Sequence, residues 1–214
     1  MKRNIVVAMT GASGSPYAVR LIDILIAAGC DVHLTISRAA TDVLKQELNL
    51  DISLDEFQPS MLRLENKAAS QKEAVPKKEV ASQEAGTIHY HHYCDFFAPI
   101  ASGSFLTDGM VICPCSGGAL SSIVHGTTAN LIHRAADVHL KERRRLILVP
   151  RETPLSLIQL ENLKRAAEAG AIVLPAMPGF YHGVSTVQDL VDFIVARICD
   201  QLGVANTLIR RWGM

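Results

Sequence analysis

The chain contains two copies of a unit that strongly constrains its fold: an apolar strand, a turn of small residues, and then a helix. In the first copy, the apolar residues 5–8 lead into the turn G-A-S-G at 11–14 and a helical pattern at 17–28. In the second copy, an apolar stretch that begins at Gly109 leads into Ser116-Gly117-Gly118 and another helix. Small side chains let a ligand reach the N–H groups at a helix start, where the helix dipole favours an anion. The two turns therefore predict a site for a phosphate-bearing ligand.

Neither turn has the sequence of a common nucleotide site. The G-x-G-x-x-G fingerprint and the lysine-bearing P-loop are both absent from these turns. For either turn alone, the alternative is a tight connection that binds nothing, because small-residue turns are common in α/β folds. The repetition of the whole unit favours the ligand site.

Strand and helix patterns alternate along nearly the whole chain. Besides the two units above, strands are predicted at 31–37, 146–149 and 171–174, and helices at 39–47, 157–169 and 186–202. About five parallel strands with covering helices give a three-layer, doubly wound parallel α/β sheet, flavodoxin- or Rossmann-like, in a single domain over residues 1–214. Several strands are followed by polar residues: Ser13, Ser37, Ser116 and Arg151. Since ligands bind at this carboxyl edge of open α/β sheets, we expect the site there.

Residues 59–86 differ in character from the rest of the chain. Alanine, lysine, glutamate, glutamine and serine dominate this stretch, and few large apolar residues follow Leu64. The composition predicts a polar, solvated insertion that lies far from the chemistry.

The stretch at 87–94 contains three histidines, two tyrosines and a cysteine, which suggests a metal site as one interpretation. In a strand, however, His89 and His91 share one face while His92 and Cys94 share the other. With the potential ligands divided in this way, the spacing favours a short sheet strand over a metal centre. No metal site is predicted in this chain.

Composition excludes several classes of protein. Hydrophobic residues make up 49% of the chain and the formal net charge is zero, which argues against a general binder of nucleic acid or of membrane surfaces. No apolar run reaches transmembrane length, and the N-terminal residues lack a signal-peptide pattern. Five cysteines at irregular spacing do not indicate a disulfide framework, so we expect a cytoplasmic protein.

A series of motifs, in order, resembles the flavin prenyltransferases of the UbiX type, within the wider family of flavin-binding decarboxylase-like proteins. The resemblance covers almost the whole chain except about residues 52–97. The motifs are M-T-G-A-S-G at 9–14, I-S-R-A-A at 36–40, A-S-G-S-F at 101–105, M-V-I-C-P-C-S at 110–116, R-A-A-D-V at 134–138, L-K-E-R-R at 140–144, V-P-R-E-T-P at 149–154, P-G-F-Y-H at 178–182 and R-W-G at 211–213.

The resemblance implies an activity and its reactants. Members of this family attach a dimethylallyl group from dimethylallyl phosphate to reduced FMN, at N5 and C6, without a metal. Their product, prenylated FMN, serves decarboxylases of the UbiD type. The family forms homododecamers built from trimers, so the resemblance implies a homo-oligomer here.

The resemblance also implies the site residues. For FMN they are Gly11, Ala12, Ser13, Ser37, Ser116, Gly117, Gly118, Ala119 and Arg151. For dimethylallyl phosphate they are Arg134, Lys141, Tyr181 and Arg197, some of them supplied by a neighbouring subunit. Glu152 matches a further member of the phosphate site, and the residues expected to be catalytic are Ser13, Glu47, Glu152 and Trp212. Ser13 and Glu47 would handle protons near N5, and Trp212 would face the allyl cation.

Three alternatives stay open on the sequence alone. One is a flavin-dependent decarboxylase of a C-terminal cysteine or of phosphopantothenoylcysteine, whose substrate-binding asparagine is replaced here by the charged pair Arg151-Glu152. Another is a non-catalytic flavin carrier, which would not need Arg134, Lys141 and Tyr181 to converge. For Trp212, the alternative is a structural anchor of the C-terminal tail against a neighbouring subunit.

Overall fold

Six parallel strands form one sheet in the described residues, 2–62 and 84–213, of this computed structural model. From edge to edge their order is β3-β2-β1-β4-β5-β6. The strands are β1 (Asn4–Met9), β2 (Asp31–Ile36), β3 (Ile88–Tyr90), β4 (Gly109–Cys115), β5 (Leu146–Pro150) and β6 (Ile172–Val173). The predicted doubly wound parallel sheet is confirmed. It has six strands because the short strand in the histidine-rich stretch, β3, joins the other five at one edge.

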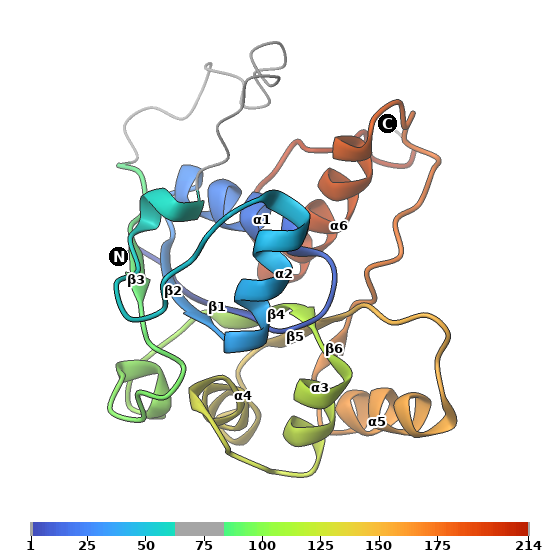
Figure 1. Cartoon of the computed structure of the whole chain (residues 1–214). Helices are drawn as coiled ribbons and strands as arrows, with labels where there is room; N and C mark the ends of the chain where they lie inside the picture. The colour runs from blue at the N-terminus through green and yellow to red at the C-terminus, as the bar shows by residue number, and fades with distance from the viewer. Residues whose placement is uncertain (1, 63–83, 214) are drawn as a thin grey trace.

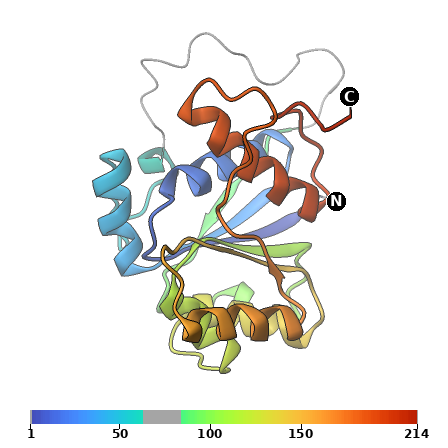
Figure 2. The same cartoon turned by 90° about the vertical axis from the view of Figure 1, so that its right-hand side faces the viewer.

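Helices cover both faces of the sheet and make the three predicted layers (Figures 1 and 2). One face carries α1 (Ser15–Ala27), α2 (Arg38–Leu48) and α6 (Val187–Leu202). The opposite face carries α3 (Gly117–Val124), α4 (Leu131–Lys141) and α5 (Leu157–Glu168). The described elements also include two short 3-10 helices, η1 (Pro59–Leu62) and η2 (Pro99–Ala101). Among the described residues, no helix has the length and apolar character needed to cross a membrane.

Successive side chains of each strand enter different hydrophobic cores. Val7 of β1 belongs to the core under α1 and α6, while its neighbour Val6 belongs to the core under α3 and α4. Both are fully buried, because helices exclude water from both faces of a parallel sheet. This double burial is why the central strands are continuous apolar runs in the sequence.

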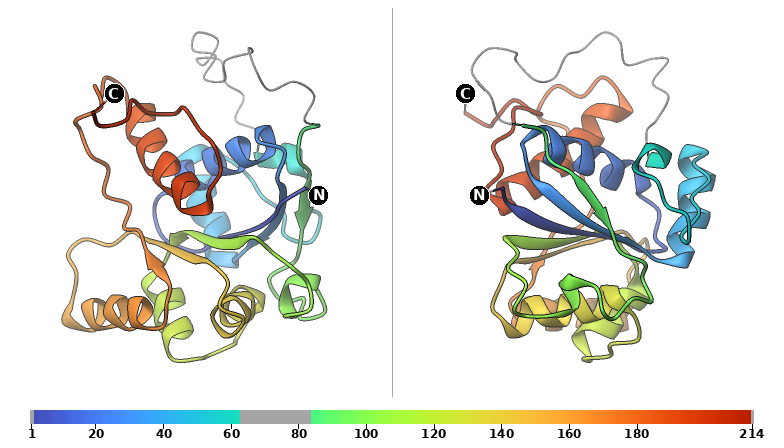
Figure 3. Two further views of the ribbon diagram at one scale, coloured as in Figure 1. Left: turned by 180° about the vertical axis from the view of Figure 1, so that it is seen from behind. Right: turned by 90° about the vertical axis from the view of Figure 1, so that its left-hand side faces the viewer.

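The strand order reverses between β1 and β4. The chain builds outward from β1 through β2 to β3, and then returns to the middle, where β4 pairs with the free side of β1 (Figure 3). At such a reversal, the connections after the two central strands leave toward opposite faces, and a crevice forms at their carboxyl ends. The two connections here are the small-residue turns that define the repeated unit.

Most of the polar stretch at 59–86 lies outside the described residues. Its two described ends pack against the fold: Leu62 of η1 is buried, and Gly86 donates its N–H to the carbonyl of Ile26 at 2.9 Å. A Cβ on Gly86 would lie 1.7 Å from the carbonyl oxygen of Cys30, so this approach requires glycine. The solvated character predicted for 59–86 stays a prediction for the residues between these ends.

The predicted short strand in the histidine-rich stretch is present as β3, but it covers only Ile88–Tyr90, so His92 and Cys94 lie beyond its end. His89 lies opposite His33 of β2 in the parallel register, and their rings stack with centroids 4.9 Å apart. The His91 ring stacks on the same His33 at 5.3 Å, with Nε2 3.0 Å from His33 Nδ1. His89 and His91 therefore share one face, as the strand period predicted. No group of three or more potential ligands in the described part of the chain has the arrangement of a metal site.

The histidine stack makes folding stability depend on pH. Burial, reinforced by His91 and His89, lowers the pKa of His33 to about 4. The folded protein therefore keeps His33 neutral, while the unfolded chain binds a proton near the ordinary pKa of about 6.5. The stability that neutral His33 contributes is fully present above about pH 6.5. It is lost as the pH falls from about 6.5 toward 4.

We expect acid to destabilise the wild-type protein more than a His33→Asn variant. Between pH 7 and pH 5, His33 alone should account for about 2 kcal/mol of the loss in unfolding free energy. Denaturant titrations at the two pH values measure the difference, and His125→Asn, which removes an exposed histidine, is the matched control. An equal loss in wild type and His33→Asn would show that the stack does not carry the effect.

Candidate active site

The side chain of Thr10 joins the two strands at the reversal point. Its hydroxyl donates to the carbonyl of Pro114 at 2.8 Å and accepts from the N–H of Ser116 at 2.8 Å, and its own N–H also donates to Pro114 at 3.2 Å. Thr10 is only 4% exposed, so these bonds are shielded from water. They fix the turn after β1 against the turn after β4.

The turn after β4 leaves an open helix start. Ser116 is the N-cap of α3, and its hydroxyl oxygen accepts from the N–H of Ala119 at 3.2 Å. The N–H groups of Gly117 and Gly118, in the first turn, have no acceptor within the helix. A Cβ on Gly118 would meet no atom of the described residues within 4 Å. This start can therefore receive an anion such as the phosphate of a flavin nucleotide.

The turn after β1 is arranged differently, because Glu47 of α2 occupies the start of α1. Its carboxylate accepts from the N–H of Gly14 at 3.0 Å and from the N–H of Ser15 at 2.8 Å. The N–H of Ala12 donates to the carbonyl of Thr10 at 2.8 Å. The N–H groups of Gly14 and Ser15 are therefore already bonded to Glu47 in this structure.

Glu47 is held as a carboxylate at neutral pH. Burial raises its pKa, but hydrogen bonds from the Ser13 hydroxyl and from the N–H groups of Gly14 and Ser15 outweigh burial and bring the pKa below its usual value. The close approach of α2, which places Glu47 here, also requires a residue without a side chain at position 11. A Cβ on Gly11 would lie 2.5 Å from the Cβ of Ala39.

Two further predicted residues lie at the same edge of the sheet. Ser37 caps α2, with its hydroxyl accepting from Ala40 at 3.3 Å, and its N–H donates to the carbonyl of Met9 at the end of β1. Arg151 follows β5, and its Nε lies 3.4 Å from the carbonyl oxygen of Ser13. The structure therefore brings the predicted flavin-binding residues together at the carboxyl edge.

Glu152 contacts α5 rather than the helix starts of α1 and α3. Its carboxylate accepts from Gln159 Nε2 at 3.1 Å, and Gln159 also forms a capping box with Ser156 at the start of α5. The Cβ position of Gly117 lies 3.5 Å from the same Gln159 nitrogen. Gln159 therefore connects Glu152 to the open start of α3.

The predicted donor-binding residues on α4 lie on the face of α3 and α5. Arg134 donates through Nε to the carbonyl of Ala101 at 3.0 Å and pairs with Asp137 at 2.9 Å. Lys141 pairs with Glu142 at the end of the helix. Arg134 and Lys141 are about two helical turns apart, on or near one face of α4.

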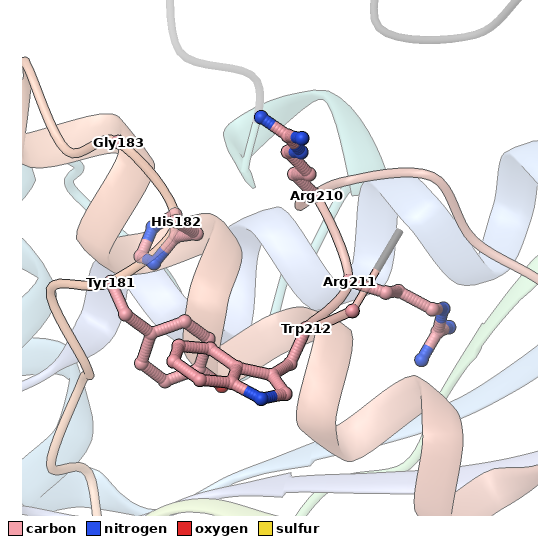
Figure 4. A pocket seen from close by; sticks show the side chains of 7 residues that line it. Tyr181, His182, Gly183, Arg210, Arg211 and Trp212 are labelled. Carbon is pink, nitrogen blue, oxygen red and sulfur yellow. The ribbon is translucent and has the colours of Figure 1, made fainter.

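The other predicted donor-binding residues lie across the sheet, on the face of α6. Tyr181 packs edge-to-face on Trp212 with ring centroids 5.2 Å apart, and on Phe193 of α6 at 5.6 Å. Arg197 of α6 pairs with Asp200 at 2.9 Å. An open pocket of about 720 Å³ lies here (Figure 4), lined by Tyr181, His182, Gly183, Arg210, Arg211, Trp212 and Gly213. Within one chain, the sheet therefore separates this group from α4.

Comparison with known proteins shows the family of this chain. The Flavoprotein family model matches residues 1–199. The flavin prenyltransferase UbiX of Pseudomonas aeruginosa is 46% identical over 209 residues, which cover 98% of this chain and 93% of that protein. The chain belongs to the UbiX family of flavin prenyltransferases.

Two solved structures of UbiX proteins share the fold over their full length. A UbiX in complex with FMN and dimethylallyl pyrophosphate is 36% identical, with a TM-score of 0.81, over 100% of this chain and 99% of the other. A dodecameric FMN-dependent UbiX-like decarboxylase from Escherichia coli O157:H7 is also 36% identical, with a TM-score of 0.79, over 99% and 100%.

The sequence did not single out Thr10 and Gln159, which the structure places beside the predicted site residues. Thr10 stands within the M-T-G-A-S-G motif, but its partners are 104 and 106 residues away in the chain. Gln159 had a local signal, because Ser156 and Gln159 have the spacing of a capping box. That spacing predicts a helix start but says nothing of Glu152.

We expect Thr10→Val to weaken FMN binding while Thr10→Ser preserves it. Valine keeps the shape of threonine but leaves the buried N–H of Ser116 without its acceptor, which distorts the start of α3. FMN affinity, measured by flavin fluorescence titration, should fall about tenfold in Thr10→Val. Equal affinity in the two variants would contradict a role for the hydroxyl.

Proposed function

We propose that this protein transfers a dimethylallyl group from dimethylallyl phosphate to N5 and C6 of reduced FMN. The observation that carries the proposal is the carboxyl edge at the β1–β4 reversal, where Thr10 joins the open start of α3 to the turn after β1, which also contacts Arg151 and the Glu47 carboxylate. The relatives support it, since a UbiX was crystallised with FMN and dimethylallyl pyrophosphate. FMN and the prenyl donor are both substrates in this reaction.

The FMN phosphate fits the start of α3. The N–H groups of Gly117 and Gly118, the Ser116 hydroxyl and the Arg151 guanidinium supply donors and positive charge for a dianion. We place the remaining predicted FMN contacts on the turns that surround this crevice: Gly11, Ala12, Ser13, Ser37 and Ala119. The two N–H groups already bonded to Glu47 are not needed for this placement.

We assign proton handling to Ser13 and Glu47. The reduced flavin supplies the atoms that are alkylated, and the chain must accept the protons that those atoms lose. The Ser13 hydroxyl hydrogen-bonds to the Glu47 carboxylate, so the hydroxyl can take up a proton that the flavin loses while it passes its own proton to the carboxylate. Glu152, which is connected to the start of α3 through Gln159, is the second carboxylate of the proposed site.

The donor site requires a neighbouring subunit in this proposal. Arg134 and Lys141 would hold the phosphate from α4 of one chain, and Tyr181 and Arg197 from the opposite face of the next. Trp212 is 80% exposed and Tyr181 55% exposed in the single chain, which leaves these rings available to a second copy. The Escherichia coli relative is a dodecamer, and we propose the same homo-oligomer here.

We also propose a recipient for the product and a cellular location for the protein. Prenylated FMN would pass to a decarboxylase of the UbiD type. All five cysteines are unpaired, as expected for a reducing compartment, and we propose a cytoplasmic location.

An anaerobic assay tests the proposed function. Protein, reduced FMN and dimethylallyl phosphate are incubated together, with dimethylallyl diphosphate in a parallel reaction, and the flavin is analysed by mass spectrometry. The gain of one C5 unit on the flavin is expected. If the flavin is unchanged, a separate reaction with oxidised FMN and a cysteine-terminated peptide or phosphopantothenoylcysteine follows, and release of CO2 there would instead identify a cysteine-type decarboxylase. Unchanged flavin with no turnover of any substrate would indicate a non-catalytic flavin carrier.

Glu47→Gln should stall prenyl transfer while FMN stays bound. The glutamine carbonyl can still accept from the start of α1, but the amide cannot take a proton, so kcat should fall about 10²- to 10⁴-fold. Glu47→Ala is the control for the structural contact, because it also loses the cap and should cost roughly 1 kcal/mol of stability. Full activity in Glu47→Gln would refute the assignment.

Substitutions of Trp212 separate an aromatic role from a structural one. If the indole face stabilises the allyl cation, Trp212→Phe should keep most activity, while Trp212→Leu should lose about 2- to 30-fold in kcat. Native mass spectrometry and flavin content are the controls for assembly and FMN binding. If leucine serves as well as phenylalanine, Trp212 only anchors the tail.

A further inference from the structure

Asp200, near the end of α6, receives four hydrogen bonds on its two carboxylate oxygens. Oδ2 accepts from Arg197 at 2.9 Å and from Arg211 at 3.1 Å. Oδ1 accepts from Arg211 at 2.7 Å and from Asn206 Nδ2 at 3.3 Å. The Asp200 side chain is 18% exposed, so these charge-assisted bonds are partly shielded from water. One carboxylate thus joins a helix arginine to a tail arginine.

The residue that follows Arg211, Trp212, makes a second contact that holds the tail. Arg211 directly precedes Trp212, whose ring packs on Tyr181 at 5.2 Å. In Figure 4 the Trp212 side chain turns toward Tyr181, while the Arg211 side chain turns away from it. The tail is therefore fastened at two adjacent residues, one by an ion pair to α6 and one by an aromatic contact.

The ion pair stays charged at neutral pH. The hydrogen bond from Arg211 lowers the pKa of Asp200, and although burial opposes this, the pairing with Arg197 and the bond from Asn206 lower it further. Asp200 also holds the pKa of Arg211 above its usual value. The restraint on the tail therefore persists through the physiological pH range.

We propose that Asp200 is a positioning residue of the prenyl-transfer site, which sets Arg197 and Trp212 relative to each other. The inference rests on the proposed function, in which Arg197 holds the leaving phosphate and Trp212 faces the allyl cation. The two charges that develop in the reaction separate as the C–O bond breaks, so the groups that stabilise them must keep a fixed spacing. Asp200 supplies this spacing through α6 and contacts neither charge itself.

Asp200→Asn and Arg211→Gln each remove one partner of the Asp200–Arg211 ion pair and so test its role. Asp200→Asn keeps the shape of the side chain and removes its charge, and Arg211→Gln replaces the guanidinium with a shorter, neutral side chain. Glu168→Gln is the matched control, because Glu168 pairs with Lys164 at 3.5 Å on α5, away from the tail. Each variant is compared as the FMN-loaded assembly by flavin content, native mass, steady-state kinetics with dimethylallyl phosphate, and acrylamide quenching of Trp212, the chain's only tryptophan.

We expect Asp200→Asn and Arg211→Gln to keep their FMN and their assembly, but to show stronger quenching of Trp212 and about a tenfold lower kcat/KM. The double variant should lose little more than either single one, because both remove the same contact. Glu168→Gln should match wild type in every measurement. If Asp200→Asn does not assemble, Arg211→Gln decides the question by the same two readouts.

Two results would overturn the inference while the proposed function stands. One is an active wild type with kinetics and quenching unchanged in Asp200→Asn. The other is a loss of activity in Arg211→Gln alone, which would mean that Arg211 contacts the substrate directly. A wild-type protein that transfers no prenyl group would overturn the proposed function itself.

Discussion

The hydroxyl of Thr10 holds together the two strand ends on which the site is built. β1 and β4 are neighbours in the sheet, yet Thr10 and Pro114 are 104 residues apart in the chain. The hydroxyl satisfies a carbonyl on one side and an N–H on the other in a place that water does not reach, where an unpaired group would cost about 1–3 kcal/mol. The start of α3 is therefore fixed relative to the turn after β1, and a ligand that contacts both meets a rigid crevice.

Two helices begin at this crevice, and the protein uses their positive ends differently. Glu47 neutralises the start of α1, and the start of α3 stays open. Had both starts been open, the crevice would attract a dianion at two competing positions. In the proposed placement, a fixed carboxylate at one start directs an incoming phosphate to the other, and it also holds an ionised group beside the Ser13 hydroxyl. A single contact thus has a structural and a chemical consequence.

The same sheet that creates the crevice also divides the remaining functional residues. Helices on both faces bury the strands, but α4 and α6 are then separated by the full thickness of the sheet. The basic residues of α4 cannot approach Tyr181 of their own chain without breaking that core. Exposed aromatic rings on one face and basic side chains on the other are the arrangement expected if neighbouring subunits complete a site, as we propose.

Much of the fold could be read from the sequence because it depends on neighbours a few residues apart. The apolar runs of β1 and β4, the helical period of α6 and the serine cap of α3 are all local patterns, and the two-residue period placed His89 and His91 on one face. The lengths of the edge strands were harder to predict: the strand predicted at 171–174 pairs with β5 only over Ile172–Val173, and β3 covers only Ile88–Tyr90.

The sequence by itself determined the order of strands and helices, the two small-residue turns and the set of polar residues at the carboxyl edge. Only the tertiary structure decided how those residues are used. The partners of Thr10, Glu47 and Arg211 lie 11 to 106 residues away in the chain, and each bond forms only after strands and helices have packed. The physical reason is that backbone preference and hydrophobic period act over a few residues, whereas buried hydrogen bonds and ion pairs depend on which distant elements the packed core brings into contact.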